Sequence, residues 1–271
     1  MKTLAILSYN RTGSTVVGQC LAQAHNKEYI GEFTNIPEVL MRYDNGRDVN
    51  VPYEPPLPEG TYVKTYDQID GRIQRTFMYD DPKPFEIGTD RYSAEVDKRK
   101  QLLKQNVINE NKSFFKIQTQ TFVRNFKDTN LLDGYSFIFC ARRDIREQTL
   151  SNLVSKNTHI MHIGFEDQTV DVPTFDIKRK HYDYYVQALK DTNRLFEHYR
   201  QRGQIQNVIH YEDWQHDVNQ ILPLLGFEPQ SVHTYKKIKY TQGHQSNLVN
   251  NLEQVYEWMA DDDIFDYKYT L

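Results

Sequence analysis

Short apolar runs alternate along most of the chain with stretches in which apolar residues recur every three or four positions. The runs predict strands at residues 3–7, 113–117, 135–141 and 205–210. The recurring positions predict helices at about residues 14–24, 145–154, 182–199, 218–225 and 252–259. Strands that alternate with helices in this way predict an α/β protein with a central parallel sheet flanked by helices.

The pattern weakens between residues 43 and 101. Residues 51–60 are rich in proline, and a second proline-containing break follows at residues 81–84. Because proline prevents a helix from continuing, the segment predicts a loop-rich insertion within a single domain of residues 1–271. Such an insertion is typical of a binding loop or lid, and a poorly constrained surface insertion is an equal alternative.

The composition excludes several classes of protein. The 271 residues suffice for one large domain with a buried core. Lys and Arg number 33 against 37 Asp and Glu, and this net charge of −4 argues against a nucleic-acid partner. The two cysteines, Cys20 and Cys140, are too few for a disulfide framework or a four-cysteine zinc site. Since no apolar run could cross a bilayer or form the core of a signal peptide, we expect a cytoplasmic enzyme with no membrane partner.

The polar segment after the first predicted strand, residues 8–15, is a candidate anion-binding loop. The helix that follows offers unpaired backbone N–H groups and the positive end of its dipole, and Gly13 lets the backbone approach a ligand. A Walker P-loop would add a lysine, whereas Arg11 is the only cation of this loop, which disfavours an ordinary NTPase. A tight turn with a solvated Arg11 is the alternative.

A second segment with the same topology follows the strand at residues 135–141. It contains Arg143 and, eight residues later in the predicted helix, Ser151. The planar guanidinium suits phosphate oxygens, and the hydroxyl adds a neutral donor. The two side chains can face one anion only if the turn between them folds back, and a solvated basic face is the alternative.

Taken together, these segments resemble the sulfotransferase family that uses 3′-phosphoadenosine 5′-phosphosulfate (PAPS). The Arg-Thr-Gly-Ser-Thr sequence of residues 11–15 is similar to the family's 5′-phosphosulfate loop, and Arg143 and Ser151 have the spacing of its 3′-phosphate site. The Tyr-Glu-Asp sequence of residues 211–213 and the predicted helix that ends in Leu-Gly at residues 225–226 complete four landmarks in family order. The resemblance implies a three-layer α/β fold like that of P-loop NTPases.

The resemblance also implies which residues bind the donor. Arg11 and backbone N–H groups of the loop would neutralise charge on the leaving phosphate, while Arg143 and Ser151 would hold the 3′-phosphate. Tyr211 would line the nucleotide pocket, and Lys116 would lie near the transferring group. The implied binding residues are Arg11, Thr12, Gly13, Ser14, Thr15, Arg143, Ser151 and Tyr211.

The resemblance implies a glutamate as the general base. Gly31-Glu32, about twenty residues after the loop arginine, is similar to the segment that supplies the base in protein-tyrosine and bacterial carbohydrate sulfotransferases. Cytosolic small-molecule sulfotransferases use a histidine instead, and Gln118 stands at the nearest equivalent position here. Glu32 and Arg11 are therefore the implied catalytic residues, and a surface glutamate in a turn is the alternative for Glu32.

The implied reaction is transfer of a sulfuryl group from PAPS to an acceptor hydroxyl by in-line displacement. No metal is expected, because arginine and the helix end supply the positive charge, and His159 and His162 are typical of a surface pair. A carbohydrate, a tyrosyl group and a small molecule all remain open as acceptor. An ATP-dependent kinase or NTPase and a non-catalytic nucleotide-binding module are the competing hypotheses. The late lysines at residues 236, 237 and 239 are more typical of a solvated cluster than of the site.

Overall fold

The computed structural model describes most of the chain. The described residues are 3–25, 27–34, 42–44, 61–67, 73–79, 90–105, 113–158, 169–170, 172–228, 239–240 and 243–271. Among these residues, no helix combines the length and the apolar character that would let it cross a bilayer.

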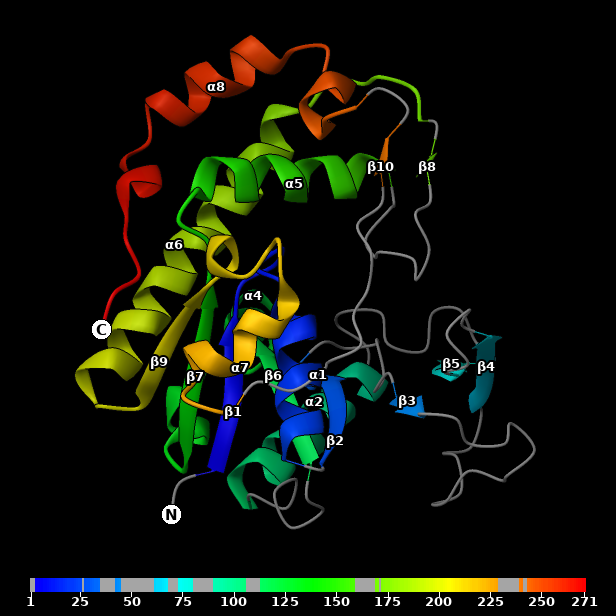
Figure 1. Cartoon of the computed structure of the whole chain (residues 1–271), viewed down its shortest axis with the longest axis vertical. Coiled ribbons are helices and arrows are strands. Elements are labelled where there is room, and N and C mark those ends of the chain that lie inside the picture. The colour runs from blue at the N-terminus through cyan, green and yellow to red at the C-terminus, as the bar shows by residue number, and fades with distance from the viewer. Residues whose placement is uncertain are drawn as a thin grey trace.

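A central sheet of five strands, all parallel, has the order β2-β6-β1-β7-β9 (Figure 1). Its strands are β1 (Thr3–Ser8), β2 (Glu28–Glu32), β6 (Ser113–Gln118), β7 (Tyr135–Ala141) and β9 (Ile205–His210). The chain leaves β1 toward one edge, returns through β6, and then crosses to β7 and β9 on the other side. Ligands of open α/β sheets bind outside the carboxyl ends of the strands at such a reversal, which here lies at the end of β1.

Helices cover both faces of the sheet. The helices are α1 (Ser14–Ala24), α2 (Asp90–Gln105), α4 (Thr119–Asn125), α5 (Ile145–Thr158), α6 (Arg179–Gln201), α7 (Ile221–Leu224) and α8 (Leu252–Ala260). Ile6 and Cys140 belong to a core shared with α1 and α7, whereas the alternating residues Leu7 and Phe139 belong to a core shared with α2, α4 and α6. Helix α5 crosses above the carboxyl ends of the strands (Figure 1).

Smaller elements complete the described fold. A second, antiparallel sheet has the order β3-β5-β4, formed by β3 (Arg42–Asp44), β4 (Thr61–Asp67) and β5 (Ile73–Tyr79). The short strands β8 (Thr169–Val170) and β10 (Lys239–Tyr240) pair with each other. The 3₁₀ helices are η1 (Thr129–Leu132), η2 (Tyr211–Asp213), η3 (Val218–Gln220), η4 (Gln245–Leu248) and η5 (Asp263–Asp266).

The predicted three-layer α/β fold, with its parallel sheet between helices, is confirmed. The strands predicted at residues 135–141 and 205–210 have the expected bounds. Helix α6 ends just before Gly203, whose φ of 63° lies in the left-handed region, where an α-helix cannot continue. The helix predicted at residues 218–225 is instead a 3₁₀ turn followed by the one-turn helix α7.

The segment at residues 43–101 differs most from the expectation. Its described parts form regular elements, namely β4, β5 and most of α2, together with the end of β3. The prolines of residues 51–60 and 81–84 lie outside the described residues. Helix α2 gave no clear signal because charged residues fill half of its positions, and few apolar residues, such as Tyr92, Val96 and Leu103, reach the core.

Gly13 lies where a neighbouring aromatic ring leaves no room for a side chain. It caps the N-terminus of α1 with a φ of 69°, in the left-handed region, and the Trp214 ring lies against its Cα. A Cβ at this position would lie 2.3 Å from Trp214 Cζ2. Gly203 has a similar φ of 63°, but no described atom lies within 4 Å of the corresponding Cβ position.

These two glycines form a matched pair for a test of packing. Both Gly13→Ala and Gly203→Ala should lose about 1–2 kcal/mol to left-handed strain. Gly13→Ala should lose about 1–3 kcal/mol more, because the methyl group displaces the Trp214 ring. Urea unfolding of both variants measures the difference, and equal losses would show that the ring does not restrict this turn.

Candidate functional site

The candidate site is built on the loop between β1 and α1. Arg11 has a φ of 61° and Gly13 a φ of 69°, so the backbone turns sharply at the carboxyl end of the central strand. The carbonyl of Gly13 accepts the N–H groups of Val16 at 2.9 Å and Val17 at 3.2 Å, which starts α1. The first N–H groups of a helix have no intrahelical carbonyl, so those of Ser14 and the residue after it can bind an anion.

The side chain of Arg11 joins this loop to α5. Its Nε donates to Ser151 Oγ at 3.1 Å, and Ser151 is buried. Burial raises the pKa of Tyr185 of α6 to about 12, and the positive charge of Arg11 opposes this increase. Arg11 therefore lies where the loop, α5 and α6 meet.

A second cation reaches the loop from β6. Lys116 is only 3% exposed, and its Nζ donates to Thr15 Oγ1 at 3.1 Å in the first turn of α1. The backbone of Glu32 pairs with Lys116 in the sheet, at the carboxyl end of β2. Glu32 is thus the last residue of a strand that borders the site, and the alternative of a surface turn does not hold for its backbone.

A network of side-chain amides fixes the backbone beside Arg11. Gln148 Nε2 donates to the carbonyl of Asn10 at 2.7 Å, and Asn10 Nδ2 donates to Gln120 Oε1 at 2.9 Å. Gln118 Nε2 donates to Asn10 Oδ1. The sequence indicates no role for Asn10, Gln120 or Gln148, and Gln118 stands out only at the position of a family histidine, because amide residues far apart in the chain form no recognisable motif.

Several buried polar atoms around this loop have no hydrogen-bond partner among the described residues. They are Ser8 Oγ at the end of β1, Gln148 Oε1, Trp214 Nε1 on the ring that covers Gly13, and Arg142 Nε. Buried polar groups are nearly always hydrogen-bonded in native proteins. A polar ligand bound at this end of the sheet would supply the missing hydrogen-bond partners for these two N–H donors, the amide oxygen and the hydroxyl.

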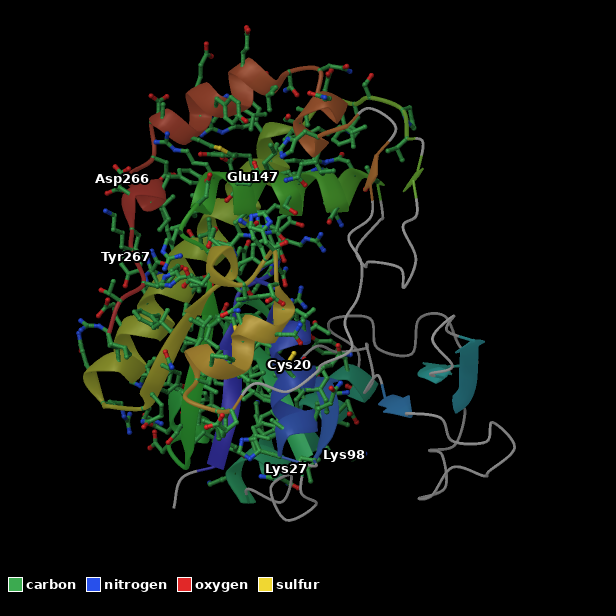
Figure 2. All side chains as sticks on the ribbon, in the orientation of Figure 1. Cys20, Lys27, Lys98, Glu147, Asp266 and Tyr267 are labelled. Atoms are coloured by element: carbon green, nitrogen blue, oxygen red, sulfur yellow. The ribbon has the colours of Figure 1, made fainter. Side chains whose placement is uncertain are left out.

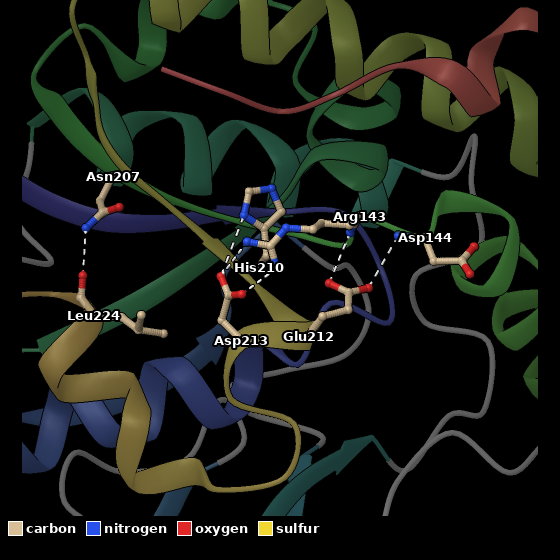
Figure 3. Close-up of polar contacts among 7 residues, drawn as sticks. All are labelled: Arg143, Asp144, Asn207, His210, Glu212, Asp213 and Leu224. Atoms are coloured by element: carbon tan, nitrogen blue, oxygen red, sulfur yellow. Dashed lines mark hydrogen bonds and ion pairs between the residues drawn. The ribbon is translucent and has the colours of Figure 1, made fainter.

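Arg143 contacts the Tyr-Glu-Asp segment instead of Ser151 (Figure 3). Its Nη1 and Nη2 both donate to the carboxylate of Asp213, the second at 2.9 Å. Glu212 accepts the backbone N–H of Arg143 at 3.1 Å and that of Asp144 at 3.3 Å, which holds the turn before α5. The eight-residue spacing thus does not bring Arg143 and Ser151 into contact, since Ser151 receives its bond from Arg11.

Tyr211, which the resemblance assigns to the nucleotide pocket, lies against the glycine of the loop. The guanidinium of Arg142 stacks on its ring with the carbon 4.2 Å from the ring centre, and the Trp214 ring meets it edge-on at 5.1 Å. A Cβ on Gly13 would lie 3.0 Å from the Tyr211 ring. The structure therefore brings residues 211–214 against the glycine turn.

The charged groups of this second segment shift one another's pKa values. The hydrogen bond from Arg143 lowers the pKa of Asp213, and the carboxylate raises the pKa of Arg143. Burial, followed by the positive charge of Arg143, lowers the pKa of His210, whose Nδ1 lies 4.0 Å from Asp213 Oδ2. Both effects favour the neutral form of the His210 imidazole.

Other residues that the sequence singled out add little to the site. Within the part of the chain that the structure describes, no three His, Cys, Asp or Glu residues are grouped as a metal site would need. His159, His162, Lys236 and Lys237 lie outside the described residues. Lys239 belongs to the short strand β10.

Comparison with protein-family models finds none that matches this sequence, and comparison with curated proteins finds no significant match. Any inference about function therefore rests on the geometry of the loop, of Ser151 and of residues 211–214.

The ion pair between Arg143 and Asp213 should make stability depend on acid pH. Since the folded pKa of Asp213 lies below its ordinary value of 3.8, the pair stabilises the fold above that value. Its contribution is lost as the pH falls through the lowered pKa. Asp213→Asn should lower the free energy of unfolding at pH 7 by only about 0.2–1 kcal/mol, because the pair is half exposed. As the pH falls, the free energy of unfolding should decrease less in Asp213→Asn than in wild type.

Urea unfolding between pH 7 and pH 3 measures both effects. Arg143→Gln removes the cause of the shift and should flatten the acid dependence equally. If Asp213→Asn keeps the wild-type pH dependence, the ion pair makes no contribution in solution.

Proposed function

We propose that the protein transfers a sulfuryl group from PAPS to an acceptor hydroxyl. The observation that carries this proposal is the hydrogen bond between Arg11 and Ser151. It joins two of the landmarks on which the sulfotransferase resemblance rests, 140 residues apart in the chain, at the carboxyl end of the central strand. Open α/β sheets bind nucleotides at this position, outside the strand ends.

The residues around the loop fit an anionic nucleotide. Arg11, the N-terminal N–H groups of α1, and Lys116, which contacts Thr15 in the first turn of α1, provide positive charge and hydrogen-bond donors around the loop. Trp214 Nε1 and Ser8 Oγ, which have no hydrogen-bond partner among the described residues, supply further polar groups. PAPS would supply an activated sulfuryl group with adenosine 3′,5′-bisphosphate as its leaving group.

The chain's own groups account for each step of the transfer. Glu32 accepts the proton of the acceptor hydroxyl as that oxygen forms a bond to sulfur, and the bond from sulfur to the 5′-phosphate oxygen breaks in line. Arg11 and the N–H groups of α1 neutralise the charge that develops on the leaving oxygen. The products are a sulfate ester and adenosine 3′,5′-bisphosphate. The backbone position of Glu32, opposite Lys116 at the end of β2, supports its assignment as base.

Arg143 would hold the 3′-phosphate without leaving Asp213. The ion pair uses Nη1 and Nη2 of the guanidinium, and the Nε–H edge has no partner among the described residues. A phosphate bound on that edge would leave the bidentate contact intact. The proposal also keeps the cytoplasmic location that we expect from the sequence.

One observation favours a second candidate function, ATP-dependent phosphoryl transfer. Lys116 Nζ lies beside Thr15 Oγ1, so β6 supplies a lysine to the loop that lacks one. A P-loop enzyme uses a lysine on the terminal phosphates and a hydroxyl on magnesium in this region. Ligand binding distinguishes the two candidates.

Adenosine 3′,5′-bisphosphate should raise the melting temperature of the protein by about 5–10 °C at a hundred times its dissociation constant. Arg143→Ala should lose most of this shift, because it removes the guanidinium that contacts the 3′-phosphate. Arg194→Ala, which removes an exposed arginine from α6, is the control and should keep the shift. Thermal melting with the bisphosphate, and separately with ATP and magnesium, tests the proposal. A shift with ATP and magnesium alone would contradict it and favour a kinase.

Glu32→Gln should lower turnover about 10²- to 10⁴-fold, because the amide cannot accept the acceptor's proton. The melting shift with adenosine 3′,5′-bisphosphate should stay unchanged, since the base does not bind the nucleotide. Glu28→Gln, at the other end of the same strand, is the matched control and should keep full turnover. Transfer of labelled sulfuryl from PAPS measures turnover, and undiminished transfer by Glu32→Gln would exclude this residue as the base.

A further inference from the structure

Exposed cations from two helices converge at one side of the site. Lys156 lies in the last turn of α5, and Lys178 and Lys180 lie at the start of α6. The positive charges of all three act on one neighbour, the half-buried His181. We call these three lysines and His181 the lysine cluster.

The charge of the lysine cluster is not neutralised by the described residues. None of them provides a carboxylate within 4.0 Å of Lys156, Lys178 or Lys180, while the nearby Arg179 is paired with Asp183 at 2.8 Å. The first turn of α6 has no acidic residue and lacks a side-chain cap, so the lysines lie at the positive end of a 23-residue helix. Like charges at that end repel the helix dipole, and a bound anion would remove the repulsion.

His181 lies on the buried side of the lysine cluster. Its Nδ1 is buried and has no hydrogen-bond partner among the described residues. Burial first, and then the charges of Lys180, Lys156 and Lys178, lower the pKa of its imidazole. The Nδ1 of this imidazole, beside three ammonium groups, can donate to a polar anionic ligand in the tautomer that carries its proton on Nδ1.

The lysine cluster adjoins the Arg11 site along both helices. His181 lies one turn before Tyr185 on the same face of α6, about 6 Å along the axis, and Tyr185 is the residue on which the charge of Arg11 acts. On α5, Lys156 follows Ser151, the partner of Arg11, by about 7.5 Å along the axis and about 140° around it, so it lies on the exposed side of the same helix. An acceptor of several sugar units that places a hydroxyl at the Arg11 site would be long enough to reach the lysine cluster.

We infer that the acceptor is an anionic carbohydrate, whose carboxylate or sulfate groups bind the lysine cluster while a hydroxyl reaches the Arg11 site. This inference rests on the proposed function. An aromatic ring favours a sugar over an acidic peptide: Tyr184 is 48% exposed, packs edge-on against Tyr185 at 5.5 Å, and lies one turn after Lys180. An exposed ring held beside cations offers a flat apolar face for a pyranose.

The test measures binding by calorimetry in the presence of saturating adenosine 3′,5′-bisphosphate. The probes are a heparin octasaccharide, the neutral maltooctaose and an octaglutamate peptide. The variant Lys156→Gln/Lys180→Gln removes two charges from the lysine cluster. Lys98→Gln/Lys104→Gln removes two from α2 and is the control, because Lys98 lies at the opposite end of the molecule from α5, where Glu147 is marked (Figure 2).

Wild type and the control should bind the heparin octasaccharide alike, and the lysine-cluster variant should bind it about tenfold more weakly. Maltooctaose should bind at least tenfold more weakly than heparin. In the transfer assay, the lysine-cluster variant should raise KM for the octasaccharide and leave kcat unchanged.

Equal binding by the lysine-cluster variant and wild type, or tighter binding of octaglutamate than of heparin, would overturn the inference. The melting shift with adenosine 3′,5′-bisphosphate separates this failure from failure of the proposed function. A protein that shows the shift but does not bind the octasaccharide keeps its donor assignment and loses only the carbohydrate acceptor. A protein without the shift loses the proposed function itself.

Discussion

The turn between β1 and α1 requires a positive φ at Arg11 as well as at Gly13, and this backbone constraint underlies the whole site. A left-handed conformation costs a residue other than glycine about 1–2 kcal/mol, so neighbouring elements must hold it. Gln148 of α5 binds the carbonyl of Asn10, and Ser151 binds the Arg11 side chain. Because the loop is restrained before any ligand arrives, an anion can bind there without a large loss of backbone entropy.

Two kinds of cation surround this loop, and they differ in what holds them. Arg11 and Lys116 donate to hydroxyl groups, on Ser151 and Thr15. Arg143 is held by a carboxylate, and its Asp213 partner occupies one edge of the guanidinium. A hydroxyl orients a cation without adding charge, whereas a carboxylate both orients it and reduces the field that an approaching anion meets. Asp213 therefore both fixes the orientation of Arg143 and weakens the positive field at the second segment.

The sequence predicted those parts of the fold in which apolar residues repeat. Strand β7 was recognisable because nearly every residue is apolar, as its burial on both faces demands. Strand β2 was not, because it lies at the edge of the sheet, where polar residues and Gly31 are tolerated. At the site, the predicted strand, polar turn and helix around residues 11–15 are present, but the contact of Arg11 with Ser151 was not predictable. The family spacing placed Arg143 and Ser151 at one phosphate, whereas the packing of α5 against the loop brings Ser151 to Arg11 and leaves Arg143 paired with Asp213.

The sheet order has a consequence for the synthesis of the chain. Strand β1 is the central one, and both of its neighbours, β6 and β7, come more than 100 residues later in the chain. At about 5–20 residues per second, a ribosome needs on the order of ten seconds to supply them. For that time β1 has two unpaired edges, and its apolar residues have no sheet in which to bury. The nascent chain must therefore be kept from pairing with other strands, and the loop at the end of β1 reaches its final contacts only late, after β7 and α5 have left the ribosome.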